Sequence, residues 1–353
     1  MSDAVRIINS VAPVRICDNG GWTDTWFAKV GKVFNVAVSP GIHVQLTARK
    51  RTCPTGGKSI TIRATHDDCH FGLVALKHGQ KRNPLIEAAL AHMTVPEDLA
   101  LDLDVWSEVP PGSSTGTSAA VAVAVLGALD QLKGGRLTPH DLAMAAYHVE
   151  AKLLGRECGV QDQLAAAFGG INFIDVHSFP RATVHPVSAT EEFLWELESR
   201  VVVMFVGKSH DSSEVHKQVI ARLAREGHGG STLESLRTFA ESSRDAVARS
   251  SLSGLAEAMI GNTEAQEALH PGLLGQGHRA VIKVAKCHGA IGWKVNGAGG
   301  NGGSITLIAP AQMEAKLRMI TAIQQAGKGF RQIPVRLCRQ GLHRWESQNG
   351  CAG

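Results

Sequence analysis

A polar loop that leads into a long apolar helix constrains the fold of this chain more than any other segment. The loop, 110–118, contains proline, glycine, serine and threonine, and the Ala/Val-rich stretch 119–132 that follows is expected to be helical. The first turn of a helix has backbone N–H groups without internal partners, and the helix dipole adds partial positive charge there. The sequence therefore predicts a site for a phosphate group at this loop.

The same loop also has a purely structural interpretation. Proline, glycine and serine are typical of turns, and a serine or threonine before an apolar run is a common helix N-cap. The loop is not a P-loop, because no Gly-Lys-Ser/Thr follows, and it lacks the spaced glycines and acidic partner of a dinucleotide-binding turn. Phosphate binding at this loop therefore needs support from other segments.

The composition argues against several classes of protein. With 353 residues, 44% of them hydrophobic and 19% charged, the chain is long enough for two domains with cores of their own. A net charge of +4 without runs of like charge predicts neither a nucleic-acid partner nor a membrane-surface partner. No stretch approaches about 18 apolar residues, and the N-terminus lacks the pattern of a signal peptide, so we expect neither a transmembrane helix nor secretion.

The seven cysteines are scattered along the chain and form no CxxC pair. This pattern favours reduced thiols in the cytoplasm over a disulfide framework or a zinc site. Cys158 lies beside a motif described below, and we expect it to be a small packing residue, as free cysteine commonly is.

The spacing of apolar and turn residues predicts strands and helices without regular alternation, which favours an α+β class with two domains. The clearest helix start is Thr138, a helix N-cap residue followed by proline and an acidic first turn. The polar residues after about 341 are expected to be loosely held. The predicted strands are 5–16, 33–49, 59–65, 99–107, 171–176, 200–206 and 330–338, with a glycine-rich hairpin at 293–308, and the predicted helices are 84–93, 119–132, 138–154, 162–169, 213–226, 232–249, 252–260, 275–289 and 311–326.

Three further segments supply the residue types that phosphoryl transfer to a hydroxyl requires. They are 12–24, the pair formed by Glu150 and 158–163, and 297–303, in which five of seven residues are glycine. The reaction needs a phosphate cradle, a cation that bridges the phosphates, a carboxylate that holds this cation or accepts the hydroxyl proton, and a positive charge nearby. All four requirements are met by residue types in these segments and the loop.

Specific residues can be assigned to these roles. Ser118 and Glu150 are candidate Mg²⁺ ligands, because Mg²⁺ prefers hard oxygens and keeps several waters. Asp162 is a candidate base, and Arg15 is a candidate cation that keeps it ionised, since an opposite charge favours the charged form of a carboxylate.

Each of these residues also has an ordinary structural interpretation. Glutamate on a helix is commonly a solvated charge, aspartate is a common helix N-cap, and arginine in a strand can lie at the surface with a buried stem. Trp22 and Trp26 are expected to pack in the protein core in preference to binding a substrate, because large aromatic side chains mostly contribute buried area.

Together and in this order, the segments resemble the three signature motifs of the GHMP small-molecule kinases, which include galactokinase, homoserine kinase, mevalonate kinase and phosphomevalonate kinase. The resemblance spans nearly the whole chain. It implies an N-terminal α/β domain similar to ribosomal-protein domains over 1–188 and a C-terminal ferredoxin-like domain over 189–353. It also implies an active site in the cleft between them, with ATP and Mg²⁺ as cofactors.

The resemblance carries roles onto individual residues. It implies Asp162 and Arg15 as catalytic residues, and Ser118 and Glu150 as the Mg²⁺ ligands. The implied ATP-binding residues are Pro111, Gly112, Ser113, Ser114, Gly116, Thr117 and Ser118. The implied substrate-binding residues are Thr23, Asp24, Gly159, Asp162, Gly299 and Gly300.

The chain departs from the family pattern at three positions. Ser114 and Thr115 stand where glycine and leucine are usual, and the missing glycine reduces the backbone conformations open to the loop. Asn301 replaces a glycine of the last motif, a smaller change because asparagine also adopts left-handed conformations.

The segments 20–25 and 161–173, together with Gly31, Phe34 and Asn35, resemble a narrower branch of sugar kinases, which contains heptose 7-phosphate kinase and the kinase domain of fucokinase. That branch phosphorylates the anomeric hydroxyl, which implies a sugar phosphate, D-glycero-D-manno-heptose 7-phosphate, as substrate in the synthesis of a polysaccharide. The candidate cations for the substrate phosphate are Arg156, Lys208, His210 and Arg279. Open alternatives are a kinase of an unphosphorylated sugar, a non-catalytic sugar sensor, a mevalonate-type decarboxylase and, for assembly, a homodimer.

Overall fold

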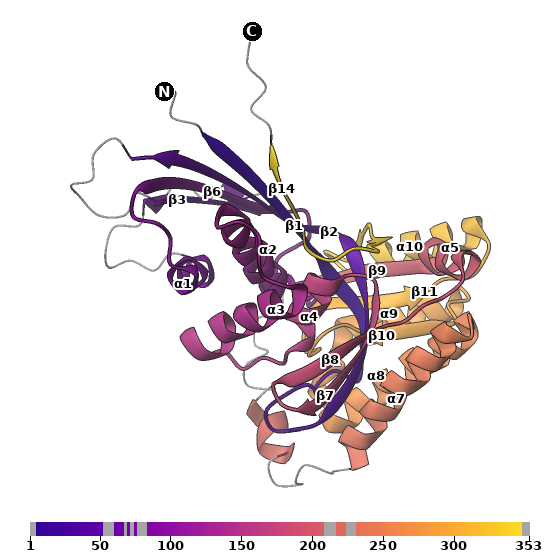
Figure 1. Ribbon diagram of the computed structural model, residues 1–353. Helices are drawn as coiled ribbons and strands as arrows, with labels where there is room; N and C mark the ends of the chain where they lie inside the picture. Colours follow the sequence, from indigo (N-terminus) through magenta and orange to yellow (C-terminus); the bar gives the residue numbers. More distant parts are fainter. Residues whose placement is uncertain are drawn as a thin grey trace.

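Two β-sheets organise the chain, and helices pack against both of them (Figure 1). Among the described residues, the first sheet contains ten strands, along the path β14-β1-β2-β6-β3-β4 with four further strands beside it, and the second contains four strands in the order β10-β11-β9-β12. The computed structural model describes residues 5–51, 60–66, 69–70, 74–75, 83–207, 217–223 and 231–347. Mixed helices and strands around two sheets confirm the α+β class.

The strands of the first sheet are β1 (Arg6–Asn19), β2 (Gly31–Lys50), β3 (Ile60–His66), β4 (Cys69–His70), β5 (Val74–Ala75), β6 (Leu99–Ser107), β7 (Ile171–Ser178), β8 (Arg181–Pro186), β13 (Arg336–Leu337) and β14 (His343–Ser347). Those of the second are β9 (Val201–Gly207), β10 (Gly292–Val295), β11 (Gly303–Ile308) and β12 (Arg331–Ile333). The helices are α1 (Pro84–Met93), α2 (Thr117–Leu132), α3 (Pro139–Tyr147), the π-helix η1 (His148–Leu153), α4 (Gln161–Phe168), α5 (Glu191–Arg200), α7 (Ser231–Ala248), α8 (Leu252–Leu269), the 3₁₀-helix η2 (Pro271–Leu273), α9 (Gln276–Cys287) and α10 (Met313–Ala326), and residues 217–223 are also helical.

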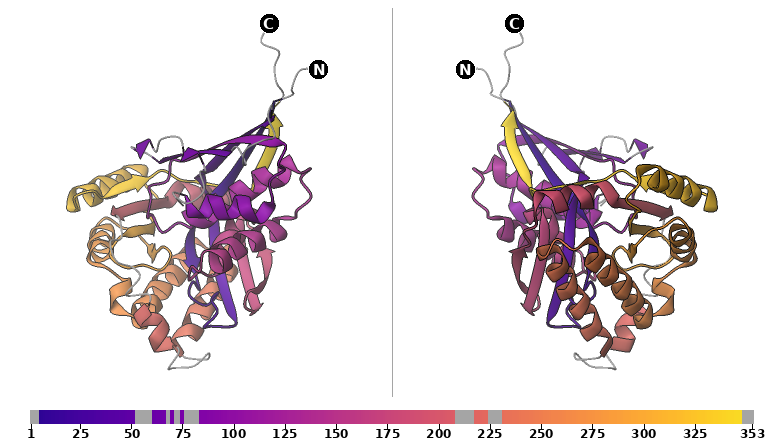
Figure 2. Two further views of the ribbon diagram at one scale, coloured as in Figure 1. Left: turned by 90° about the vertical axis from the view of Figure 1, so that its left-hand side faces the viewer. Right: turned by 90° about the vertical axis from the view of Figure 1, so that its right-hand side faces the viewer.

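The long antiparallel pair β1–β2 lies between two groups of helices (Figures 1 and 2). The magenta helices α2 and α4 pack on one side of this pair, and the orange helices α7 and α8 pack on the other. β1 and β2 are buried along much of their length because both faces are covered. The loop 20–30 that joins them therefore extends from a rigid hairpin.

The helix α2 is buried on nearly all sides, which explains its unusual composition. Its alanine and valine side chains are small enough for it to pack against β1, β2 and the helices α1, α3 and α4. Such a helix has a weak hydrophobic face and is held by its surroundings. Its N-terminus, and the loop before it, are therefore fixed by the core.

The second sheet has its own apolar core. Val202, Met204 and Leu307 from the strands pack with Val281 of α9 and Met319 of α10. On its other side, α8 contacts both β10 and β1, and so connects the second sheet to the first.

The helix α8 is longer than the expected 252–260. Gly261, the first residue after the predicted end, lies inside the helix. A Cβ at this position would lie 2.3 Å from the ring of Phe239 on α7. The glycine serves close packing between the two helices and does not terminate α8.

The C-terminal segment is also ordered further than expected. β14 pairs with β1, with Asn9 opposite Trp345, so the expectation of loose residues after 341 is wrong for 343–347. The single strand expected at 330–338 is divided between β12 in the second sheet and β13 in the first. After β12 the chain therefore returns to the first sheet. The expected boundary between two domains after residue 188 remains a proposal.

The helix expected over 138–154 begins as predicted and changes type before it ends. Thr138 accepts from Asp141 N, and Asp141 accepts from Thr138 N, which is a complete capping box. After Tyr147 the chain continues as the π-helix η1. Among the described helices, none combines the length and apolar character needed to cross a membrane.

Candidate active site

The loop 110–118 forms a turn that presents backbone N–H groups at the start of α2. Gly112 and Gly116 have φ values of 75° and 73°, a region that glycine adopts without steric cost. Gly116 is the N-cap residue of α2, no side chain caps the helix, and its first turn carries no acidic residue. The positive end of the helix therefore has no carboxylate of its own, and the loop has the geometry of a phosphate site.

Ser114 holds a backbone conformation that glycine would adopt with less strain. Its φ is 58°, in the left-handed region, where a residue with a Cβ costs about 1–2 kcal/mol. Its carbonyl oxygen accepts a hydrogen bond from Arg15 Nη1 at 2.5 Å. Thr115 is buried, and its hydroxyl lies 2.7 Å from that of Ser113. The turn is thus kept although Ser114 and Thr115 replace glycine and leucine.

Ser118 and Glu150, the residues assigned to Mg²⁺, lie in direct contact. Ser118 Oγ donates to Glu150 Oε1 at 2.6 Å, and Gln163 Nε2 donates to the other carboxylate oxygen at 2.8 Å. Burial is the largest effect on the pKa of Glu150, which is raised. Glu150 lies in η1, and short π-helical segments are frequent at functional sites.

The chemistry of this pair fits Mg²⁺ only together with phosphates. Two hard oxygens 2.6 Å apart suit an ion that retains waters and takes further oxygens from a nucleotide. Among the described residues, no three His, Cys, Asp or Glu side chains are grouped so that they could hold a metal ion. Arg156 Nη1 donates to Ser118 Oγ at 2.9 Å and lies 3.6 Å from Glu150 Oε1, so this contact has to open when a cation binds.

The structure brings Arg15 and Asp162 together in a two-point contact. Arg15 Nε donates to Asp162 Oδ1 at 2.8 Å and Nη2 donates to Oδ2 at 3.3 Å, which fixes the plane of the carboxylate. Arg15 is buried, while 31% of the Asp162 side chain is exposed. Burial disfavours the charged guanidinium, but the carboxylates of Asp162, Asp18 and Asp24 outweigh burial and raise the pKa of Arg15. Arg15 is therefore a permanent cation that orients a partly exposed carboxylate.

A cavity of about 180 Å³ lies beside this ion pair. We call it the acidic cavity, because carboxylates dominate the charged groups among its described lining residues. These groups are the carboxylates of Asp18, Asp24, Glu157 and Asp162 and the guanidinium of Arg15, and the aromatic side chains of Trp22, Trp26 and Phe27 supply apolar walls.

Asp24 is buried in this cavity at the N-terminus of α4. Its Oδ2 accepts a hydrogen bond from Gln161 N at 3.0 Å. Burial, the largest effect, and the nearby charge of Asp162 raise the pKa of Asp24 to about 6, although the Gln161 N–H favours the charged form. Gly159 allows the close approach, since a Cβ built there would lie 1.9 Å from Asp24 Oδ2.

Thr23, which was expected to bind substrate, faces the backbone of its own loop. It is fully buried, and its hydroxyl donates to Gly20 O at 2.7 Å and accepts from Lys32 N at 3.1 Å. It is not among the residues that line the acidic cavity. Thr23 therefore holds the loop that carries Asp24.

The glycine-rich loop meets the cavity at other residues than expected. Gly300 N donates to Leu273 O at 2.9 Å, and a Cβ on Gly299 would lie 2.2 Å from the same oxygen. Both glycines therefore pack against Leu273 of η2. The residues of this loop that line the cavity are Gly297 and Ala298. A backbone that approaches this closely explains the need for small residues.

Sequence reasoning missed the place of Asp18 and the two tryptophans in this cavity. Asp18 is buried at the end of an apolar strand, and a carboxylate in such a position was the available signal. Trp22 packs in an apolar cluster with Phe27, as a packing residue would. Trp26 is 48% exposed and its Nε1 donates to Glu157 Oε2 at 2.6 Å, so Trp26 is not a core packing residue.

A second cavity, of about 320 Å³, is lined in part by the loop 110–118, which we call the phosphate loop. Its walls are largely apolar, with a few polar groups among them. The polar groups include Ser118 and Arg156, and the apolar walls include Leu85, Ile86 and Val121. We call it the apolar cavity.

Gly116 lies close to the candidate base. A Cβ built on it would lie 3.3 Å from Asp162 Cγ and 3.4 Å from Arg15 Cγ. The start of α2 therefore adjoins the Arg15–Asp162 pair. A phosphate held at this loop would lie near a hydroxyl held in the acidic cavity.

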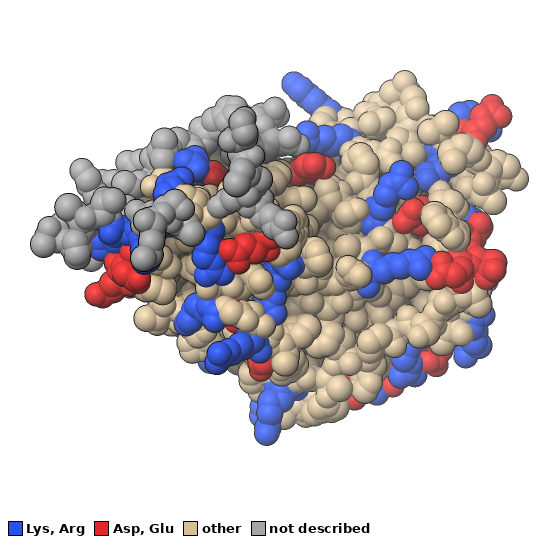
Figure 3. Space-filling view, turned by 45° about the horizontal axis from the view of Figure 1, so that its top comes forward, with Lys and Arg blue, Asp and Glu red and all other residues tan. Residues whose placement is uncertain are grey.

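Basic and acidic side chains are interspersed over the face of the molecule shown in Figure 3. Exposed ion pairs of the described chain include Arg339–Glu191 and Arg6–Glu346. That neither nucleic acid nor a membrane surface is a partner stays a prediction.

Comparison with known proteins relates these features to a family. Residues 83–170, which include the phosphate loop, Glu150 and Asp162, match the model of the GHMP kinases N terminal domain. The chain is 24% identical over 351 residues to D-glycero-alpha-D-manno-heptose 7-phosphate kinase of Campylobacter jejuni, which covers 97% of this chain and 99% of that protein.

Two further likenesses extend this result. The chain is 28% identical over 322 residues to the bifunctional fucokinase/GDP-fucose pyrophosphorylase of Arabidopsis thaliana, covering 87% of this chain but only 30% of that protein. The solved structure of a D-glycero-D-manno-heptose 1-phosphate kinase from Bacteroides thetaiotaomicron superimposes with a TM-score of 0.73 at 20% identity, over 97% of this chain and 100% of that one.

Proposed function

We propose that this chain, which carries a GHMP kinase N-terminal domain and has the GHMP kinase fold, transfers the γ-phosphoryl group of ATP to the anomeric hydroxyl of a sugar. One observation supports the proposal above the others. A partly exposed carboxylate, Asp162, is fixed by Arg15 next to the start of α2; this ion pair lines one cavity, and the phosphate loop lines a second.

The apolar cavity and the phosphate loop would hold the nucleotide. Apolar side chains suit a planar base, and the N–H groups at the start of α2 suit its phosphates. Ser118 and Glu150 would hold Mg²⁺, which when bound neutralises charge on the phosphates. Arg156 would leave Ser118 on binding and would remain near the phosphates as a second positive charge.

In the acidic cavity, Asp162 would accept the proton of the attacking hydroxyl. Both of its oxygens contact Arg15, so the carboxylate is held in one orientation. Asp24, also in this cavity, would bind a ring hydroxyl of the sugar.

The name of the Campylobacter relative supports a sugar phosphate, D-glycero-D-manno-heptose 7-phosphate, as substrate. The charges of the acidic cavity favour a second candidate, an unphosphorylated sugar of the fucose type. Its described lining residues include four carboxylates and one cation, Arg15, which is already paired. Neither Arg279, which pairs with Glu267, nor Arg156, which contacts Ser118, is among the described lining residues, and Lys208 and His210 lie outside the described residues.

An ADP-release assay with ATP and Mg²⁺ tests the proposal. The panel contains heptose 7-phosphate, unphosphorylated heptoses, fucose, arabinose, galactose and mevalonate. Turnover of heptose 7-phosphate alone supports the sugar-phosphate substrate, and turnover of a free sugar supports the second candidate. ATP binding without turnover of any compound contradicts the kinase and favours a sugar sensor.

We also propose that the reaction takes place in the cytoplasm and supplies sugar 1-phosphates for polysaccharide synthesis. The described cysteines Cys17, Cys158, Cys287 and Cys338 are free thiols, as a reducing compartment would keep them.

A further inference from the structure

A buried ion pair, Asp18–Lys294, lies directly behind the candidate base and has no role in the mechanism above. Lys294 Nζ lies 3.4 Å from Asp18 Oδ1, and both side chains are 1% exposed. Asp18 comes from β1 and Lys294 from β10, so the pair joins the two sheets. Charged groups buried so completely are rare, and they are expensive unless each is compensated.

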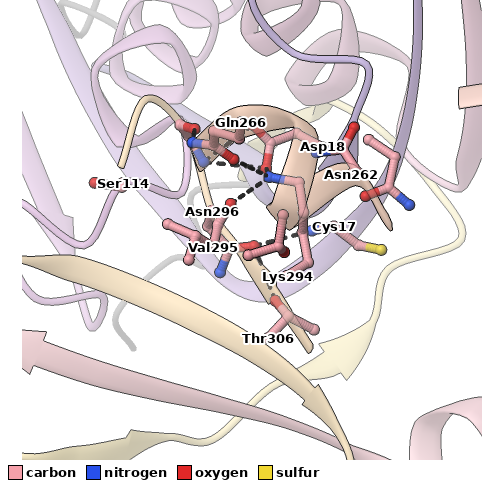
Figure 4. Close-up of polar contacts among 12 residues, drawn as sticks. Cys17, Asp18, Ser114, Asn262, Gln266, Lys294, Val295, Asn296 and Thr306 are labelled. Carbon is pink, nitrogen blue, oxygen red and sulfur yellow. Dashed lines mark hydrogen bonds and ion pairs between the residues drawn. The ribbon is translucent and has the colours of Figure 1, made fainter. Parts of the chain in front are cut away.

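Lys294 is held from several directions. Its Nζ donates to Gln266 Oε1 at 3.1 Å and to the carbonyl oxygen of Val295, and Figure 4 shows these contacts converging on the amine. Gln266 in turn donates to Gly297 O at 3.0 Å. Burial lowers the pKa of Lys294, and the charge of Asp18 acts against this effect.

Asp18 lies between two cations. Lys294 is on one side, and Arg15 Nη2 lies 3.8 Å from Asp18 Oδ2 on the other. Gly297 N also lies 3.0 Å from both carboxylate oxygens. Burial disfavours the charged carboxylate, but Arg15, Lys294 and Gly297 outweigh burial and lower the pKa of Asp18.

Arg15 therefore has two carboxylates within reach. It forms close hydrogen bonds with Asp162 and only a longer contact with Asp18, although Asp18 is the more deeply buried of the two. A buried anion attracts a cation more strongly than a partly solvated one, because the effective dielectric is lower. Without another partner, Asp18 would compete with Asp162 for the guanidinium.

We propose that Lys294 neutralises Asp18 and thereby reserves Arg15 for Asp162. Lys294 and Asp18 are then positioning residues, which act on the candidate base through Arg15. The inference rests on the proposed function for its effect on turnover, but not for its effect on Arg15. Because Lys294 lies in β10, just before the glycine-rich loop 297–303, the second half of the chain sets the alignment of a base carried by the first.

Four variants test this proposal: K294M, D18N, the double variant D18N/K294M and the control K316M. K294M leaves Asp18 without its partner, so Arg15 should move toward Asp18. The double variant removes both charges and should return Arg15 to Asp162. Lys316 is a partly buried lysine of α10 that donates to Ser199 O at 2.5 Å, and it does not line the acidic cavity.

The first measurement is the Arg15 Nε–H resonance in a ¹H–¹⁵N spectrum, assigned with R15K. We expect K294M to shift it toward its position in D162N, and D18N, D18N/K294M and K316M to leave it near the wild-type position. A wild-type resonance in K294M overturns the proposal. If K294M does not fold, D18N/K294M provides the test. The proposal requires this double variant to fold and to keep the wild-type Arg15 resonance, and a failure of either overturns it.

The second measurement is the kinetics with the sugar found by the panel. K294M should lower kcat about 100-fold, the effect of a misplacement of about 1 Å, with the affinity for ATP unchanged. D18N/K294M should recover most of the kcat that K294M loses. If the ion pair served only to stabilise the fold, the double variant would be as impaired as K294M. If the wild type turns over no sugar, the proposed function fails, and the resonance alone still decides the role of Lys294.

Discussion

The two cavities differ in how the chain builds them. The apolar cavity takes its proposed phosphate site from one continuous segment, in which the loop 110–118 runs directly into α2. The acidic cavity is assembled from residues far apart in the sequence, among them Arg15, Asp162 and Gly297. The first depends on backbone N–H groups and the second on buried charges. The proposed phosphate site therefore depends on little beyond one loop and its helix, whereas the orientation of the candidate base requires several parts of the fold.

The sharpest test of this difference is D162N. Loss of a general base lowers turnover by about 10²–10⁴-fold, and the backbone phosphate site should bind ATP as before. Steady-state kinetics and nucleotide titration measure the two effects separately. Unchanged turnover would show that Asp162 is not the base, and parallel loss of ATP binding would show that the two cavities are not independent.

The pH dependence of folding tests the burial of Asp24. Its pKa of about 6 in the folded chain is higher than the unfolded value of about 3.9, so the folded state binds more protons between these values and its stability falls as pH rises through this window. Two units correspond to about 3 kcal/mol. Urea unfolding at pH 4 and pH 7 should show that D24N loses less stability than the wild type over this interval. An equal loss in both proteins would contradict a raised pKa.

On the nucleotide side, E150Q should weaken the response to Mg²⁺. The amide keeps the size of the side chain but removes a charged oxygen ligand, so the Mg²⁺ concentration for half-maximal activity should rise about 10-fold or more. Titration of activity with Mg²⁺ measures this half-maximal concentration. Because Gln163 only supports Glu150 through a hydrogen bond, Q163M should give a smaller shift. Identical Mg²⁺ titration curves for E150Q and the wild type would show that Glu150 is not a Mg²⁺ ligand.

The smallest effect is expected from S114G. Glycine adopts the φ of 58° without the strain of a Cβ, so the variant should be more stable by about 1 kcal/mol. S114A retains the Cβ and is the matched control, for which no gain from φ is expected. Thermal unfolding compares the two, and an equal change in both variants would show that strain at this position is not the cause.

Sequence patterns predicted features whose physical cause is local. The loop 110–118, the capped helix start at Thr138 and the strands β1 and β2 follow from turn residues, capping and alternation, which act over a few neighbouring residues. The pairing of β14 with β1 was missed, because it depends on a partner more than 300 residues away, at Ile7↔Ser347. The same limit applies to Gly261, whose role depends on a ring of another helix.

By itself the sequence determined which chemical groups are present: a candidate phosphate loop, a candidate base at Asp162, and a positive charge at Arg15. Tertiary structure alone decided which carboxylate that charge contacts, since Asp18 and Asp162 were both available. It also placed Lys294 against Asp18 and turned Thr23 toward its own loop. The physical reason is that electrostatic interactions depend on distance and burial, and neither can be read from spacing along the chain.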